Sequence, residues 1–447
     1  MAATQRIAAG VTAAVACAAA LAGCAIGDTG AEEGAYGDGA RAATKGAGAP
    51  APKAAAPEAP APKTVVRLIG DGSTAFTGAQ PHLPRPERLK PGQKPPQFVV
   101  FSWDGAGEDS QRLFSHFRKV AKANNATMTY FLSGVYMLPE GKRQLYRPPQ
   151  HSPGRSDIGF NDEQGVKDTV RQLRGAWLEG NEIGTHFNGH FCGGGGGVGQ
   201  WSVEEWKDEI AQAKLFVKSW KTSTGTTKAS PLPFDYDEEL IGARTPCLEG
   251  RKNFMGAARE LGFRYDSSGV GSQVWPKKDN GLWDLSLQLV PVPGRAFETL
   301  SMDYNFLVNQ SGTTTQGNGA KHVYWGDQMR DGLLAGFSRA YEGNRAPLII
   351  GNHFESWNGG TYMRAVRETI ERVCTKSEVR CVSFRQLADW LDAQDPKTLD
   401  KLRTLEVGKA PEQGWESFLA EQPEQPEQPA QPAPAPKGVP GASAVKP

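Results

Sequence analysis

The chain has 447 residues, and its 50 Lys and Arg side chains nearly balance its 49 Asp and Glu side chains. This balance excludes the strongly basic character of a nucleic-acid-binding protein, so we expect no nucleic-acid partner. The length could hold two or three average domains. Much of the proline lies near the two ends, however, while tryptophan, phenylalanine and aliphatic residues fill the middle. We therefore expect one large folded core between two extended ends.

The N-terminus has the pattern of an export signal. Arg6 precedes an Ala- and Val-rich run, residues 7–21, that is too short to span a bilayer comfortably. The run ends in the tetrapeptide LAGC, which resembles the lipobox of bacterial lipoproteins, where the cysteine (here Cys24) is diacylated. The alternative is a plain secretory signal. Both predict export, and lipid on Cys24 would anchor the protein to the outer face of the bacterial cell membrane.

We divide the chain into four parts by composition. Residues 1–23 are the signal peptide, and residues 24–63 form an Ala/Pro/Gly-rich tether. Residues 64–407 are the folded domain, and residues 408–447 form a Pro-rich tail. The tether and the tail contain too few apolar residues to bury a core, so we expect both to be extended or disordered.

Within residues 64–407, an irregular arm (65–97) precedes strands that alternate with helices. We predict strands at 98–103, 127–132, 183–185, 240–243, 263–265, 347–351 and 380–383, and helices at 108–123, 162–178, 202–220, 254–261, 361–373 and 384–393. Ser202 and Glu205 have the spacing of a capping box. This alternation predicts an α/β fold with a parallel sheet, and the length favours a barrel over an open sheet.

Polar residues stand at the ends of four predicted strands. Asp104 closes the first strand, and His186 and His190 follow another, four residues apart, so that they could converge on one cation. Arg244, before Thr-Pro, could orient a carboxylate, and His353 ends an apolar run. Because functional residues of barrels lie at the carboxyl ends of strands, these five could form one site. Separately, each could be structural: a helix cap, an ion pair, a core or surface histidine.

In their order, these motifs resemble the polysaccharide deacetylase family, the family 4 carbohydrate esterases, and the details are closest to its chitin-deacetylase-like branch. The resemblance covers residues 97–391, with matches at 98–106, at EIGTHFNGH (182–190), at RTP (244–246) and at His353. It implies a distorted (β/α) barrel, here a single-domain monomer, that removes N-acetyl or O-acetyl groups. The substrate would be an N-acetylated polysaccharide, either peptidoglycan or a chitin-like polymer.

The resemblance also implies a role for each residue. A divalent metal, usually zinc, would be bound by His186 and His190. Asp104 aligns with the general base and His353 with the general acid. Arg244 would orient Asp104.

One departure from the family concerns the metal. Gly105 stands where the family has a second aspartate, the third metal ligand, whereas catalytic zinc usually has three protein ligands. Shifting the register by one residue would make Asp104 the ligand and leave Trp103 at the base position. Nearby acids that could substitute are Glu108, Asp109 and Glu355. The alternative function is therefore an impaired, deacetylase-like lipoprotein that binds glycan without hydrolysis.

The role of a further acid, Asp266, stays open. It either steadies His353 or simply ends its strand. Aromatic side chains that could line a glycan groove, or equally pack in the core, are Trp201, Trp275, Trp283, Trp325 and Trp357. The Gly/Thr/Asn-rich stretch within residues 290–324 could be a lid, a substrate loop or an insertion.

Four cysteines lie beyond the signal and Cys24, and they allow three pairings. Cys374 and Cys381 are the easiest pair because only a short segment separates them. That leaves Cys192, next to the histidine pair, with Cys247, next to the Arg-Thr-Pro motif. The alternative is that Cys192 is a thiolate ligand in place of the missing aspartate.

Overall fold

The computed structural model describes residues 66–420. The predicted signal peptide, the lipidation candidate Cys24, the tether and the end of the Pro-rich tail lie outside these residues. Within 66–420, no helix combines the length and the apolar character needed to cross a membrane.

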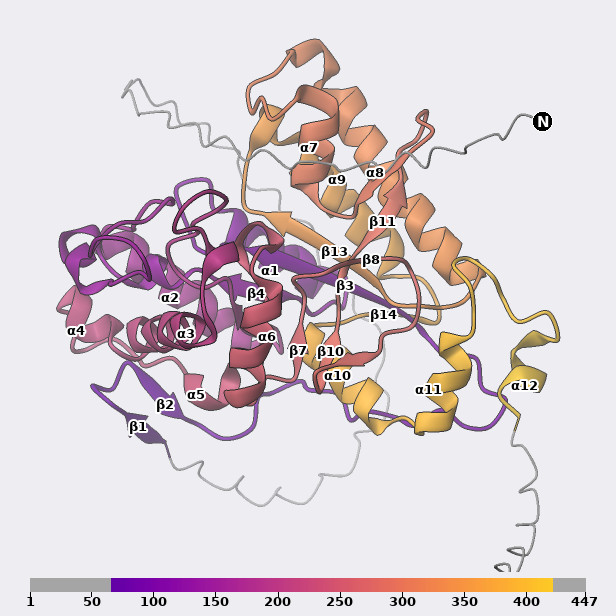
Figure 1. Cartoon of the computed structure of the whole chain (residues 1–447), viewed down its shortest axis with the longest axis horizontal. Helices are drawn as coiled ribbons and strands as arrows, with labels where there is room; N and C mark the ends of the chain where they lie inside the picture. The colour runs from indigo at the N-terminus through magenta and orange to yellow at the C-terminus, as the bar shows by residue number, and fades with distance from the viewer. Residues whose placement is uncertain (1–65, 421–447) are drawn as a thin grey trace, which may run out of the picture.

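The core of the fold is a curled sheet whose strands are parallel except at one edge. Its order is β13-β3-β4-β5-β6-β7-β10-β9, with β14 also on β3, and only β9 and β10 pair antiparallel. The strands are β3 (Gln97–Asp104), β4 (Thr129–Leu132), β5 (Glu182–Thr185), β6 (Gly242–Ala243), β7 (Tyr265–Asp266), β9 (Lys278–Asp279), β10 (Leu282–Asp284), β13 (Leu348–His353) and β14 (Val379–Cys381). The α/β class and the barrel type that we predicted are confirmed, as a half-barrel that does not pair β13 with β9 (Figure 1).

Helices cover this sheet. They are α1 (Leu113–Ala123), α2 (Glu163–Leu178), α3 (Val203–Lys218), α4 (Trp220–Thr224), α5 (Tyr236–Glu239), α6 (Arg251–Glu260), α7 (Asp303–Ser311), α8 (His322–Glu342), α9 (Trp357–Val373), α10 (Phe384–Ala393), α11 (Pro396–Arg403) and α12 (Gly414–Phe418). Shorter 3-10 helices occupy 134–137, 140–145, 198–200, 246–248 and 319–321. The capping box of Ser202 and Glu205 opens α3 as predicted, and the Asp162 carboxylate caps α2 by accepting from the Gly165 amide.

Strand β3 shows how the chain separates two cores. All eight of its residues are buried, as expected for a strand covered on both faces. Because side chains alternate along a strand, Val99, Phe101 and Trp103 pack into one apolar cluster, and Phe98 and Val100 pack into the other. The same alternation places Asp104 on the side opposite Trp103.

Three regions differ from the predicted elements. Helix α1 begins at Leu113 rather than at residue 108, because Arg112 has a left-handed φ of 55° that a helix cannot include. The predicted irregular arm contains a hairpin, β1 (Arg67–Ile69) and β2 (Thr74–Phe76). The folded part also continues past residue 407, since Trp415 and Phe418 of α12 pack against the core.

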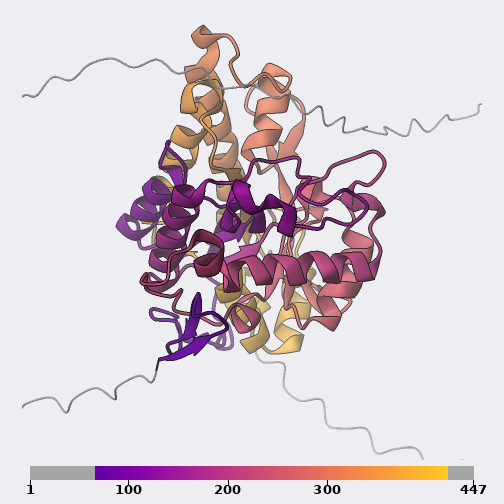
Figure 2. The same cartoon turned by 90° about the vertical axis from the view of Figure 1, so that its left-hand side faces the viewer.

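The segment that the sequence left unassigned is folded. It contains β11 (Leu287–Pro291), β12 (Glu298–Leu300), helix α7 and the start of α8, and β8 (Val270–Gly271) completes a small sheet of order β12-β11-β8. Helices α7, α8 and α9 form a projection at one end of the molecule, and α11 and α12 lie at the other end (Figures 1 and 2).

Candidate active site

A buried ion pair lies at the carboxyl end of β3. The Arg244 guanidinium, which is fully buried just after β6, donates from Nη1 to Asp104 Oδ1 at 2.8 Å. It also donates to the hydroxyl of Ser102 at 2.9 Å and to the hydroxyl of Ser267 at 2.7 Å. Burial alone would raise the pKa of Asp104, but the charge of Arg244 lowers it below its ordinary value. Asp104 is therefore a carboxylate held in one orientation.

The side chain of Trp103 points into the core. Its ring stacks on Phe354 with centroids 4.4 Å apart, and its Nε1 lies 3.2 Å from the sulfur of Met128, inside the core. Trp103 therefore does not reach the site, and the unshifted alignment agrees with the structure. In that alignment Asp104 stands at the base position and Gly105 at the third-ligand position.

The two histidines of the predicted metal pair come together after β5. His186 Nδ1 lies 2.8 Å from the main-chain oxygen of Arg244, so Nδ1 carries the proton. Its Nε2 is buried and has no hydrogen-bond partner among the described residues. The ring centroids of His186 and His190 are 5.0 Å apart. Burial lowers the pKa of both imidazoles, that of His190 to about 3, so both are in the neutral form that metal ions bind.

A buried acid holds the loop between these histidines. Glu209 of α3 accepts hydrogen bonds from the amide of Asn188 at 3.0 Å and from the hydroxyl of Tyr146 at 2.9 Å. That hydroxyl in turn accepts from the amide of Gly189 at 3.0 Å. Burial raises the pKa of Glu209 to about 7. We did not predict this role from the sequence, although Glu209 falls on the buried face of α3 with Trp206.

His353 lies beside Asp104, because β13 pairs with β3 and these two residues are register partners. Asp303, the first residue of α7, accepts from the His353 amide and contacts its Nδ1, each at 2.7 Å. Burial would lower the pKa of His353, but the Asp303 carboxylate outweighs it and raises that pKa to about 9. His353 is therefore protonated at neutral pH.

Asp266 does not steady His353, so this one of its two predicted roles is wrong. Its carboxylate accepts from Arg251 Nε at 2.5 Å and from the Ser268 amide at 2.9 Å. The other interpretation, an acid that ends its strand, agrees with β7 ending at Asp266. Asp303 takes the place next to His353, and it lies in the segment to which the sequence gave no role.

Asp104, His186, His190 and His353 line one cavity of about 420 Å³. The polar residues of its lining also include Glu108, Asp109, Ser133, Tyr136, Asn161 and Glu355. Of the five tryptophans proposed for a glycan groove, only Trp357 lines this cavity, together with Tyr304 at a ring-centroid distance of 5.9 Å. The other four are at most 5% exposed and pack in the core.

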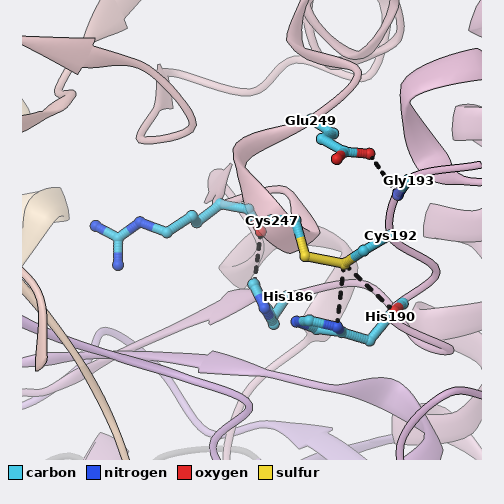
Figure 3. The surroundings of a disulfide bond; sticks show 7 residues. His186, His190, Cys192, Gly193, Cys247 and Glu249 are labelled. Atoms are coloured by element: carbon cyan, nitrogen blue, oxygen red, sulfur yellow. Dashed lines mark hydrogen bonds between the residues drawn. A yellow bond between two sulfur atoms is a disulfide. The ribbon is translucent and has the colours of Figure 1, made fainter. Parts of the chain in front are cut away.

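Both predicted disulfides are present. Cys374 pairs with Cys381, and Cys192 pairs with Cys247, which ties the histidine loop to the segment after Arg244 (Figure 3). Cys192 Sγ lies 3.5 Å from His190 Nδ1. Because this sulfur is bonded to Cys247, the alternative that Cys192 is a thiolate ligand is wrong for this structure.

The residues fit a divalent cation in part. The two neutral imidazoles are the expected donors, and the Nε2 of His186 has no hydrogen-bond partner among the described residues. Among residues 66–420, however, the only three His, Cys, Asp or Glu ligand atoms within 4.8 Å of one another belong to His190, Cys192 and Cys247, and two of these are the disulfide sulfurs. No carboxylate therefore completes the pair in the described part of the chain. Glu108, Asp109 and Glu355 line the cavity but do not form such a group.

Comparisons with known proteins give one sequence relative and several distant structures. The chain is 21% identical over 339 residues to chitin deacetylase 1 of Bombyx mori, which covers 71% of this chain. The chain spans about half (54%) of that relative's length. No family model matches the chain.

Two of the solved structures are a protein of Mycobacterium smegmatis assigned as a polysaccharide deacetylase and a pseudoenzyme of the CE4 family from Bacillus anthracis. The first is 15% identical with a TM-score of 0.41, covering 69% of this chain and 95% of that one. The second is 10% identical with a TM-score of 0.35, covering 68% and 70%.

The sheet and its polar edge define a class of protein, the curled α/β barrels with a histidine-rich site at the carboxyl ends of their strands. Within that class, the order of the motifs resembles the polysaccharide deacetylase family, the family 4 carbohydrate esterases, and the chain is similar in sequence to a chitin deacetylase.

Proposed function

We propose that the protein is a hydrolase that removes N-acetyl or O-acetyl groups from a cell-envelope or environmental polysaccharide, either peptidoglycan or a chitin-like polymer. One observation carries the proposal. Asp104 and His353 are register partners that line one cavity, and their pKa values are shifted in opposite directions. Such a pair supplies a general base and a general acid at the same pH.

In this proposal the chain's own residues move the protons. Asp104, oriented by Arg244, takes a proton from the water that attacks the acyl carbon. His353 then gives a proton to the departing amine or hydroxyl of the sugar. Because Asp303 binds Nδ1, the proton that is transferred is the one on His353 Nε2. The products are acetate and a deacetylated sugar.

His186 and His190 are the residues that would hold a divalent cation, and zinc is the ion that the resemblance implies. When bound, such an ion polarises the acyl carbonyl and acidifies a water molecule. The Arg244 main chain fixes the orientation of His186, and the disulfide lies against His190. Trp357 and Tyr304 provide an aromatic wall on which a sugar ring can stack.

A second candidate function rests on Gly105. With only two imidazoles from the expected ligand set, the protein would bind glycan without hydrolysis. Acetate release from chitooligosaccharides and from peptidoglycan, with added zinc or cobalt, separates the two functions. Acetate that is lost in Asp104→Asn supports the hydrolase. Glycan binding without acetate at any metal concentration would refute it in favour of the binding protein.

We also propose that the mature protein is exported and anchored by lipid on Cys24 to the outer face of the bacterial cell membrane. The LAGC tetrapeptide supports this proposal. The mass of the N-terminal peptide of the mature protein tests it. A peptide that begins with a diacylated Cys24 is expected, and an unmodified N-terminus elsewhere would rule out the anchor.

A further inference from the structure

Ser133 lies between Gly105, at the expected third-ligand position, and the predicted ligand His186. It follows β4 directly, and β4 lies between β3 and β5 in the sheet. Gly105 follows β3 and His186 follows β5, so the three residues stand side by side at the carboxyl edge. All three line the same cavity.

The hydroxyl of Ser133 also lies where a carboxylate at position 105 would extend. A Cβ atom built on Gly105 would be 3.8 Å from Ser133 Oγ and 3.8 Å from the hydroxyl of Tyr136. The carboxylate oxygens of an aspartate lie two bonds beyond Cβ. Ser133 Oγ and the carboxylate of an aspartate at position 105 could therefore reach the same place in the cavity.

Two polar atoms at these adjoining strand ends have no hydrogen-bond partner among the described residues, and neither has Glu108 Oε1 elsewhere in the cavity lining. Ser133 is fully buried and its Oγ accepts and donates no hydrogen bond among the described residues. The Nε2 of His186, at the end of the neighbouring strand, is also buried and has no hydrogen-bond partner among the described residues. A buried polar group without a partner is unfavourable, so two of them at adjoining strand ends indicate a shared ligand.

We propose that Ser133 Oγ is the third protein donor of a divalent-cation site with His186 and His190, a neutral hydroxyl in place of the family's carboxylate. This inference rests on the cation site of the proposed function. A hydroxyl binds a cation more weakly than a carboxylate does, so the site would favour ions that accept neutral oxygen ligands and would bind them loosely. Tyr136 closes the cavity beside this donor.

A double-mutant cycle on cobalt binding tests the proposal. The affinity of the full chain for Co²⁺ alone is measured by competition with a chromogenic chelator, without substrate. Ser133→Ala is expected to weaken Co²⁺ binding about tenfold or more in the natural background. In the Gly105→Asp background the carboxylate can replace Ser133 Oγ as the third donor. There the same substitution is expected to change the affinity less than about twofold.

The controls separate a ligand from a structural serine. Ser383, a buried serine that caps α10 and does not line the cavity, provides the matched variant Ser383→Ala, which should leave Co²⁺ affinity unchanged. Equal losses for Ser133→Ala in both backgrounds would assign a structural role and overturn the proposal. So would a loss in Tyr136→Phe that Ser133→Ala does not show, or no Co²⁺ binding by the unsubstituted chain. Co²⁺ binding that depends on Ser133, in a protein that releases no acetate, would refute the hydrolase and leave this inference standing.

Discussion

The contact between Asp303 and His353 gives a prediction that is specific to this structure. Asp303→Asn keeps the shape of the side chain and an oxygen that can accept from His353 Nδ1, but it removes the charge. With the charge gone, only the weaker effects of the Asp104 and Glu355 carboxylates oppose burial, so the pKa of His353 should fall from about 9 toward its ordinary value of 6.5. Because His353 acts as an acid only when it is protonated, the upper pH limit of activity should fall with it.

The size of the effect follows from the two pKa values. A change from about 9 to 6.5 corresponds to about 3 kcal/mol of lost stabilisation of the imidazolium form. The high-pH limb of the acetate-release profile should therefore move down by up to about two pH units. In the unsubstituted protein that limb is expected near pH 9, the pKa of His353. A titration of the His353 ring protons by NMR measures the same shift without any need for turnover.

Asp266→Asn is the matched control, because Asp266 is equally buried but binds Arg251. It should leave the high-pH limb in place, even if it lowers stability. A limb that stays near pH 9 in Asp303→Asn, or one that moves by the same amount in Asp266→Asn, would refute the role of Asp303.

Four further outcomes are expected. Gly105→Asp should raise Co²⁺ affinity, measured by chelator competition, about tenfold or more. Because residue 105 has a left-handed φ of 66°, the substitution should lower the free energy of unfolding by at most about 1–2 kcal/mol in thermal unfolding. Unchanged affinity would contradict the alignment. The pKa of Glu209 is raised, so its contribution of about 3 kcal/mol to the free energy of unfolding is complete below pH 4.5 and is lost as pH rises through about 7. Glu209→Gln should therefore make the melting temperature less dependent on pH between these values. An unaltered pH dependence would contradict the assignment. Replacing Cys192 and Cys247 by serine should cost about 4 kcal/mol in chemical unfolding, given the 55-residue separation, and should weaken Co²⁺ binding; a loss of stability alone would show that the disulfide does not support His190. Trp357→Ala should raise KM for oligosaccharides about tenfold with little change in kcat, as expected for a ring that only stacks on the sugar; a fall in kcat alone would contradict this.

The site residues that could be predicted are those fixed by the parallel sheet. Asp104, His186, Arg244 and His353 each follow or end a strand, and the carboxyl ends of parallel strands meet at one edge whatever the loops do. A short apolar run that ends in a polar residue is therefore enough to place each of them. The register of the first motif could not be decided in this way, because it depends on which face of β3 buries the large ring of Trp103.

Asp303 could not be predicted, because its place depends on a contact between distant segments. Met302 forms an isolated bridge with Gly351 of β13, and this bridge brings the next residue, Asp303, to His353. No local sequence pattern indicates that Met302 and Gly351 form this bridge. Glu209 did carry a signal, since an acid on the apolar face of an amphipathic helix is expected to have a buried partner. Gly105 was recognised as a departure, but Ser133 beside it became visible only once β4 was placed between β3 and β5.

The disulfide between Cys192 and Cys247 has a practical consequence for anyone who isolates this protein. The bond holds the loop of His190 against the segment that follows Arg244, so the position of that imidazole depends on oxidation as well as on folding. Material made in a reducing cytoplasm would have the same sequence and the same sheet but a less constrained His190. Its metal content would then describe the reduced form. The free-thiol content of a sample should be known before its metal content is interpreted.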